Sequence, residues 1–106
     1  MDGSWVVISK MKVEVRRSDR SGKKWQAELP SGKKVHFGAT GYQDFTQHAD
    51  AKRRESYLAR HRPGQDWTRG GVNTAGFWAR HLLWEKPTIR GAARALASKG
   101  LQVKVR

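Results

Sequence analysis

The feature that most constrains this fold is a stretch of ten residues, 75–84, that would be apolar around most of a helix. Its sequence is AGFWARHLLW, with polar side chains only at Arg80 and His81. Asn73 and Thr74 precede it, and either side chain can accept a hydrogen bond from a free N–H group at the start of a helix. A helix that is apolar on most of its faces is usually surrounded by protein. The sequence therefore predicts a buried central helix.

The first third of the chain has the period-two alternation that is typical of strands. Apolar residues alternate with polar ones along two stretches, first at Met11, Val13 and Val15 and then at Trp25, Ala27 and Leu29. A turn at residues 18–22 separates the two stretches, and a tight loop at residues 30–32, Pro-Ser-Gly, leads to a third strand with Val35 and Phe37. We expect an antiparallel meander with one apolar face and one lysine-rich face, preceded by a short apolar run at residues 5–8.

A basic amphipathic helix is predicted after the meander. It begins between Thr46 and Asp50, ends near His61, and is stopped by the pair Pro63-Gly64. In the loop before it, Tyr42 and Phe45 are expected to be aromatic anchors. Ala51, Tyr57 and Leu58 are expected to face the core, and the exposed side would carry Lys52, Arg53, Arg60 and Arg62.

The end of the chain predicts a third helix and a last strand. Five apolar residues fall on one helical face, namely Ile89, Ala92, Ala93, Leu96 and Ala97, and Gly100 is placed to end that helix. Leu101, Val103 and Val105 then alternate with polar residues, and this strand could join an edge of the N-terminal sheet. The whole pattern predicts one α+β domain over residues 1–106. Its small, mostly antiparallel sheet, made of the N-terminal meander and the C-terminal strand, would pack against about three helices.

The composition limits the possible partners. Lys and Arg number 22 against 9 Asp and Glu, which gives a formal net charge of +13 and favours a polyanionic partner. There is no cysteine, so the fold cannot depend on disulfides or on zinc–thiolate sites. No apolar run approaches the roughly 18 residues that span a bilayer, and residues 1–4 lack the features of a signal peptide. We therefore expect a protein that is not secreted and has no membrane partner.

Nucleic acid is the polyanion that this charge favours, and DNA is preferred over RNA as the partner. Binding would run through phosphates, with weak sequence preference, since no helix-turn-helix, zinc-finger or ribonucleoprotein motif is present. The candidate contact residues are Lys23, Lys24, Lys33, Lys34, Lys52, Arg53, Arg54, Arg60, His61, Arg62, Trp67, Arg69, Arg90 and Arg94. Trp67 is included because it stands in a polar linker and could stack on a base. Phe77, Trp78 and Trp84 are expected in the core instead.

Two small groups of residues raise the question of catalysis. Asp44, His48 and Asp50 are the one local group that could hold a metal, although hydrogen bonds of Asp44 and His48 to each other or to the loop backbone explain them more simply. Tyr57, Arg60 and His61 could serve a phosphodiester reaction, but such a helix face is more often a phosphate clamp or a packing contact. We expect no catalytic site, no metal and no cofactor.

The middle of the chain also carries four motifs in a specific order. They are His36-Phe37-Gly38, then Gly41-Tyr42-x-Asp44, then Tyr57-Leu58-x-Arg60-His61, and then Thr74-Ala75-Gly76-Phe77-Trp78. With Lys86-Pro87-Thr88-Ile89 after them, these motifs resemble a family of small basic proteins of unknown function from large DNA viruses of algae and amoebae and from some tailed phages. The resemblance covers residues 35–89. It implies a viral source, in the virion or in the interior of the infected host cell, and it implies no established activity.

Three functional hypotheses follow. The first is a viral nucleic-acid-binding accessory protein that binds DNA without sequence specificity and helps to organise or package a genome. The second is a virion structural or interaction protein whose positive surface meets an acidic capsid or core protein. The third is a small nuclease or recombination factor that uses Asp44, His48, Tyr57 and His61.

Overall fold

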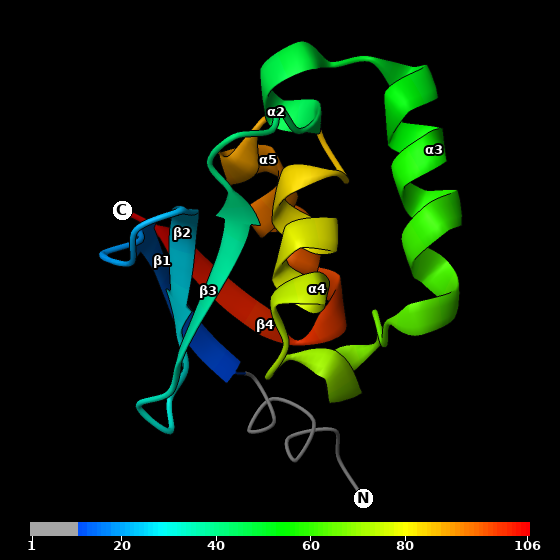
Figure 1. Ribbon diagram of the computed structural model, residues 1–106. Coiled ribbons are helices and arrows are strands. Elements are labelled where there is room, and N and C mark those ends of the chain that lie inside the picture. Colours follow the sequence, from blue (N-terminus) through cyan, green and yellow to red (C-terminus); the bar gives the residue numbers. More distant parts are fainter. Residues whose placement is uncertain (1–10) are drawn as a thin grey trace, which may run out of the picture.

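The computed structural model describes residues 11–106, and its sheet has four strands in the order β3-β2-β1-β4 (Figure 1). Strands β1 (Met11–Arg17), β2 (Lys23–Glu28) and β3 (Lys34–Ala39) form the predicted antiparallel meander. Gly32 has a φ of 92° in the β2–β3 turn, a backbone conformation that favours glycine. The predicted apolar run at residues 5–8 lies outside the described residues.

The fourth strand, β4 (Leu101–Val105), pairs with β1 at the edge of the sheet, as the alternation had predicted. The two strands run parallel, with Val13 beside Val103, so the sheet is mixed. A parallel neighbour requires a long crossover, and the helical part of the chain provides it. The crossover ends with α5 (Ile89–Ala95) and the 3₁₀ turn η4 (Leu96–Lys99), after which Gly100 adopts a φ of 79° and turns the chain into β4.

The central helical segment consists of α4 (Ala75–Trp78) and the π-helical η3 (Ala79–Leu83). The Thr74 hydroxyl accepts a hydrogen bond from Phe77 N, so Thr74 is the cap of the segment. Trp78 is 0% exposed, and its indole Nε1 donates to the carbonyl oxygen of Val72 at 2.8 Å. Phe77 and Leu82 are equally buried. The predicted central helix is thus confirmed, and it packs against the apolar face of the sheet.

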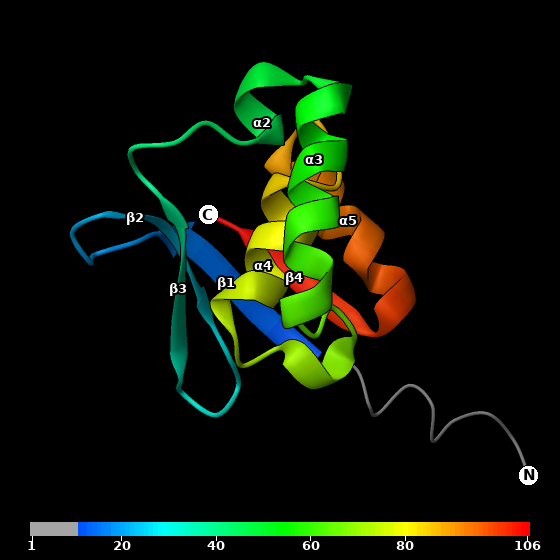
Figure 2. The same cartoon turned by 45° about the vertical axis from the view of Figure 1, so that its right-hand side comes forward.

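The basic helix α3 (Ala51–His61) lies outside the central segment, on the side away from the sheet (Figures 1 and 2). It follows the short helix α2 (Phe45–His48), and Asp50 caps it by accepting hydrogen bonds from Lys52 N and Arg53 N. The chain then continues through the 3₁₀ turns η1 (Arg62–Gly64) and η2 (Arg69–Gly71) to α4. None of the helices in residues 11–106 is long and apolar enough to cross a membrane.

Two expectations about this region were wrong. Ala51 is exposed, because the inward stripe of α3 begins one turn later, where Arg54 lies next to Trp84. Tyr42 is not an anchor: its side chain is 76% exposed, and the loop is fixed instead by the backbone carbonyl of Tyr42, which accepts a hydrogen bond from Lys24 Nζ at 2.6 Å. Tyr57 is buried and Leu58 half-buried, as predicted.

Candidate functional site

The candidate contact residues do not form one surface. Lys33 and Lys34 lie at the β2–β3 turn, and Figure 1 shows that turn at the opposite side of the molecule from α3. Arg90 and Arg94 are exposed on α5, and Arg90 Nη1 donates to the carbonyl oxygen of Val105 at 3.0 Å. Lys33 and Lys34 therefore lie far from the cations of α3, and Arg90 and Arg94 lie on another helix. Of the hairpin cations, Lys24 lines a cleft together with cations of α3.

Lys24 serves the fold. Its Nζ lies 2.8 Å from Asp44 Oδ2 and 2.7 Å from Gln47 Oε1, and its side chain is only 12% exposed. Asp44 in turn caps α2 and accepts a hydrogen bond from Thr46 N. The Lys24 ammonium thus ties strand β2 to the start of α2, and its charge is neutralised locally. This pairing was not predicted from local patterns, because the two residues are twenty positions apart.

Arg54 is also held inside the protein. Its Nε donates to the carbonyl oxygen of Trp84 at 2.7 Å, and its Nη2 lies 3.4 Å from Glu85 Oε1. Arg80 approaches the same Glu85 oxygen at 2.5 Å. Partial burial alone would raise the pKa of Glu85, but the hydrogen bond from Arg80 and the charges of Arg80 and Arg54 together lower that pKa. Glu85 is therefore ionised at neutral pH and neutralises part of the charge of both arginines.

Four cations at α3 have a different environment. Lys52, Arg53, Arg60 and Arg62 are all exposed. Within residues 11–106, none of the four forms an ion pair with a carboxylate. Arg53 and Arg60 are seven residues apart, which places them on one side of the helix and about 10 Å apart along its axis. Glu55, the acidic residue of α3, points away from both, because it is offset by about 140–200° around the axis.

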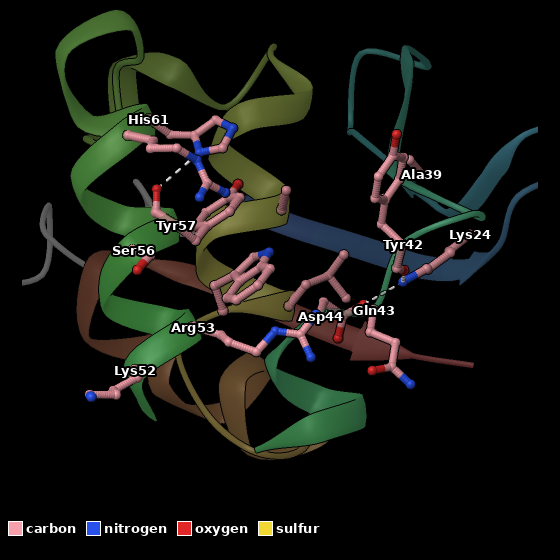
Figure 3. Close-up of a pocket in the computed structure, with 15 residues that line it drawn as sticks. Lys24, Ala39, Tyr42, Gln43, Asp44, Lys52, Arg53, Ser56, Tyr57 and His61 are labelled. Atoms are coloured by element: carbon pink, nitrogen blue, oxygen red, sulfur yellow. Dashed lines mark hydrogen bonds and ion pairs between the residues drawn. The ribbon is translucent and has the colours of Figure 1, made fainter. Parts of the chain in front are cut away.

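Three of these cations, Lys52, Arg53 and Arg60, line a cleft of about 730 Å³ and are called the wall cations below. Helix α3 forms one wall of the cleft, and the end of β3 with the loop after it, including Tyr42 and Gln43, forms the other (Figure 3). Figure 3 shows the Arg53 side chain extending from α3 toward Gln43 and Asp44, whereas Lys52 points outward. The cleft has the volume of a small-ligand site.

Aromatic rings form the floor of the cleft. The rings of Tyr57 and Trp84 are stacked with centroids 4.2 Å apart and an interplanar angle of 5°. His61 stacks on the other face of Tyr57 at 4.1 Å, and its Nδ1 donates to the Tyr57 carbonyl oxygen at 2.9 Å. Both faces of Tyr57 are thus covered, and the Tyr57–Trp84 pair presents its edges to the cleft. This stack is the packing contact that the sequence left open as an alternative to a phosphate clamp.

The floor offers hydrogen-bonding groups that the protein does not use. Within the described part of the chain, neither the Tyr57 hydroxyl nor the Trp84 indole N–H makes a hydrogen bond, although both residues line the cleft. Burial raises the pKa of Tyr57 above its ordinary value, while the positive charges of Arg80 and Arg60 act in the opposite direction. The phenol is therefore neutral at physiological pH, and it can donate or accept a hydrogen bond.

Trp67 has structural partners. Its indole Nε1 donates to Gln65 Oε1 at 2.8 Å, and its carbonyl oxygen accepts a hydrogen bond from His81 Nε2 at 2.8 Å. The Arg80 guanidinium lies 5.3 Å from the centre of its ring. Trp67 is half-buried and does not line the cleft, whereas the exposed ring of Tyr42 and the edge of Trp84 do. Sequence analysis did not foresee these partners of Trp67, because a polar neighbourhood in sequence says little about neighbours in space.

The candidate catalytic residues all have structural partners. His48 Nδ1 accepts a hydrogen bond from Asp50 N at 2.9 Å, and Asp44 is bound to Lys24 and to the start of α2. Asp44 and His48 thus bond to the backbone, as one of the two simpler explanations predicted, and not to each other. Across residues 11–106, no group of three or more His, Cys, Asp or Glu side chains could hold a metal ion. Asp44, Tyr57 and His61 all line the cleft, whereas His48 does not.

The remaining candidates have the following positions. Lys23 is half-buried on β2, and Lys33 and Lys34 are exposed, with Lys34 Nζ 4.0 Å from Asp19 Oδ2. Arg69 lies in η2 and approaches Gly100, since a Cβ added to Gly100 would meet its Nη1 at 2.9 Å. None of these four residues lines the cleft.

Residues 13–61 of the chain are similar to a family of unknown function, DUF5754. The similar region begins in β1 and ends with α3, so it contains the Lys24–Asp44 ion pair and the wall cations but not Trp84. This region overlaps residues 35–61 of the resemblance described above. The description of the family names neither a source organism nor an activity. No curated protein matches the chain, and no solved structure matches it.

Proposed function

We propose that this chain is a viral accessory protein that binds nucleic acid through phosphate contacts, without sequence preference, in the organisation or packaging of a genome. The viral source rests on the motif resemblance, and the binding rests on charge. The observation that carries the proposal is the set of wall cations on α3. Their positive charges are exposed and have no carboxylate partner within residues 11–106, so a phosphate there would not have to break an existing ion pair.

The net charge of +13 supports the same function. A cation that is already paired with a carboxylate contributes little to phosphate binding. An unpaired cation neutralises a phosphate and releases counterions from the nucleic acid. Three such contacts predict that the logarithm of the affinity falls with the logarithm of the salt concentration with a slope of about −2 to −3. Because phosphates are the same in every sequence, unrelated strands should bind with similar affinity.

The test compares two double variants with the same change in charge. Arg53→Glu with Arg60→Glu removes two cations from the cleft wall, and Arg90→Glu with Arg94→Glu makes the same change on α5. Affinity for several unrelated oligonucleotides is measured by fluorescence anisotropy over a series of salt concentrations. We expect the α3 variant to reduce the affinity and to make the salt slope shallower by about 2, and the α5 variant to have a smaller effect.

Two results would count against the proposal. Binding that does not respond to salt, or no binding at low ionic strength, would show that phosphates are not the ligand. An equal loss in both double variants would show that overall charge matters and that α3 has no special part. Circular dichroism of both variants establishes that any loss is not due to unfolding, which we do not expect because all four arginines are exposed.

A further inference from the structure

The cleft combines two environments that differ in charge. Its α3 wall carries the exposed wall cations, whereas the carboxylate of Asp44, which also lines the cleft, is neutralised by Lys24 at 2.8 Å. The floor is formed by the neutral side chains of Tyr57 and Trp84, together with Leu83. A ligand that fits both environments has an anionic part at the rim of α3 and a neutral, flat, polar-edged part below it.

We infer that the cleft binds an unpaired nucleotide of a single strand, with its phosphates at Arg53 and Arg60 and its base inside the cleft against the edges of Tyr57 and Trp84. This inference rests on the proposed function and adds the kind of strand and the place of the base. Sequence analysis had selected the cations of this cleft as contact residues. It had not selected Trp84 or Tyr42.

The hydrogen-bonding groups of the floor suit the edge of a base. The Trp84 indole N–H donates, and the neutral Tyr57 hydroxyl both donates and accepts, and both are without partners in residues 11–106. A base offers carbonyl and ring-nitrogen acceptors and amino donors along its Watson–Crick edge, and these are free only when the base is unpaired. Groups of this kind would leave the site open to several bases, which agrees with the absence of a motif for sequence readout.

Tyr42 supplies the stacking surface. Its ring is 76% exposed, and it stands on the wall opposite α3 (Figure 3). The rings of the floor are already stacked on each other, so Tyr42 is the aromatic residue of the cleft with a face free for a base. Stacking of a base on an exposed aromatic ring strengthens binding by about 5- to 150-fold.

The depth of the cleft disfavours a duplex. Tyr57 is only 8% exposed, so its hydroxyl is reached only from inside the cleft, between α3 and the Tyr42 loop. In a duplex the Watson–Crick edges are occupied and the bases are stacked within the helix, so a base reaches such a floor only after it is flipped out. Phosphates of a duplex could still touch the wall cations, but they would do so without the contribution of the base.

The experiment uses three ligands of the same length and label. They are a single-stranded oligothymidylate, the same strand made entirely of abasic sites, and a duplex, and an oligouridylate adds an arm for RNA. The abasic strand retains the phosphates and lacks the bases, so it separates the two parts of the site. We expect the wild type to bind oligothymidylate at least about fivefold more tightly than the abasic strand or the duplex.

Two single variants test the base, and one double variant tests the phosphates. Tyr42→Ala removes an exposed ring, and Tyr57→Phe removes the hydroxyl while keeping the stacked ring. Each should weaken binding of the strand with bases by about fivefold or more and leave binding of the abasic strand unchanged. Arg53→Glu with Arg60→Glu should weaken binding of every ligand. Gln102→Ala, an exposed change on β4 away from the cleft, is the control. It should change neither the affinity for the strand with bases nor the affinity for the abasic strand.

The outcomes distinguish this inference from the proposed function. Equal binding of the strand with bases and the abasic strand, unchanged by Tyr42→Ala and Tyr57→Phe, would overturn the inference and leave phosphate binding intact. No binding of any strand would overturn both, and binding of an acidic peptide alone would assign the cleft to a protein partner. Photocrosslinking of a strand with 5-iodouracil adds an independent check: the inference requires crosslinks at Tyr42 or Trp84, and crosslinks confined to other residues would contradict it.

Discussion

Two helical segments, α4 with η3 (residues 75–83) and α3 (Ala51–His61), are similar in length and differ in how they are held. The inner segment buries residues on several sides, among them Phe77, Trp78 and Leu82, all at 0% exposure. Helix α3 has a single fully buried residue, Tyr57, and the rest of its surface is half-buried or exposed. The inner segment therefore contributes most to the core, and α3 exposes most of its charged side chains to solvent.

This difference has a physical cause. The apolar surface of the inner segment is removed from water on several sides, and that burial is the main favourable term in folding. The contacts that hold helix α3 include one aromatic stack, the half-buried Leu58, and the bonds of Arg54 to Trp84 and Glu85. A helix attached through so few contacts can open without unfolding the whole domain. Substitutions in the inner segment and in α3 should therefore differ in the stability that they remove.

Removing the centre of the core should have the largest effect. Trp78→Ala leaves a cavity in the core and also removes the hydrogen bond to Val72. We expect it to lower the free energy of unfolding by about 3–5 kcal/mol, which is much of the stability of a domain of this size. Urea denaturation followed by far-ultraviolet circular dichroism measures this change. A loss below about 1 kcal/mol would mean that the inner segment does not hold the fold.

Removing the aromatic contact of α3 should have a smaller and more local effect. Tyr57→Ala deletes the ring that lies between Trp84 and His61, and we expect a loss of about 2–3 kcal/mol. Hydrogen exchange followed by mass spectrometry should show faster exchange in residues 51–61 and little change in residues 75–83. Equal acceleration in both segments would show that α3 and the core unfold as one unit.

Two neighbouring arginines of α3 should differ in their contribution to stability. Arg54→Ala removes the hydrogen bond to the Trp84 carbonyl and leaves Glu85 with one arginine partner instead of two, so we expect a loss of about 1–2 kcal/mol. Arg53→Ala, at the next position, is exposed and should change stability by less than about 0.5 kcal/mol. Thermal denaturation of both variants measures the difference. Equal losses would contradict the assignment of Arg54 to the fold and Arg53 to the cleft.

The smallest effect should be a pH dependence from the inner segment. Burial lowers the pKa of His81 below its ordinary value of 6.5, the charges of Arg80 and Lys99 lower it further, and the hydrogen bond to the Trp67 carbonyl and the charge of Glu85 act in the opposite direction. The unfolded chain therefore takes up the proton first, so stability decreases as the pH falls below about 6.5. The carboxylate of Glu85 also has a lowered pKa, so its contribution is lost only below 4.5.

A His81→Gln variant separates the histidine from the other groups. Its amide can still donate to the Trp67 carbonyl, but it does not titrate. Between pH 7.5 and 5.5 the wild type should lose stability in urea denaturation, and the variant should lose less. The same slope in both proteins would show that His81 is not the source of this pH dependence.

Local patterns predicted much of the fold. The alternation at Val13 and Val15, the loop ending in Gly32 and the cap at Thr74 each depend on neighbours in sequence, and each is confirmed. The parallel direction of β4 was not predicted, and Ala51 and Tyr42 were wrongly predicted to pack against the protein. These features depend on contacts between distant segments, which alternation and periodicity do not describe.

The candidate site was predicted only in part. The wall cations were selected because they are charged, and charge is visible in any sequence. Lys24 and Arg54 were selected for the same reason and proved to be held by Asp44, Trp84 and Glu85. Trp84 was assigned to the core and in fact shows an edge to the cleft.

Local properties of the chain, namely charge, periodicity and caps, specify a strongly basic protein with a buried apolar segment and this order of strands and helices. The tertiary structure alone decided which cations are neutralised and which remain unpaired, because ion pairs join residues that are distant in sequence. It also decided that the wall cations, the Tyr57–Trp84 stack and the exposed ring of Tyr42 surround one cleft. A cleft exists only where separate segments are packed beside one another, so no local pattern contains it.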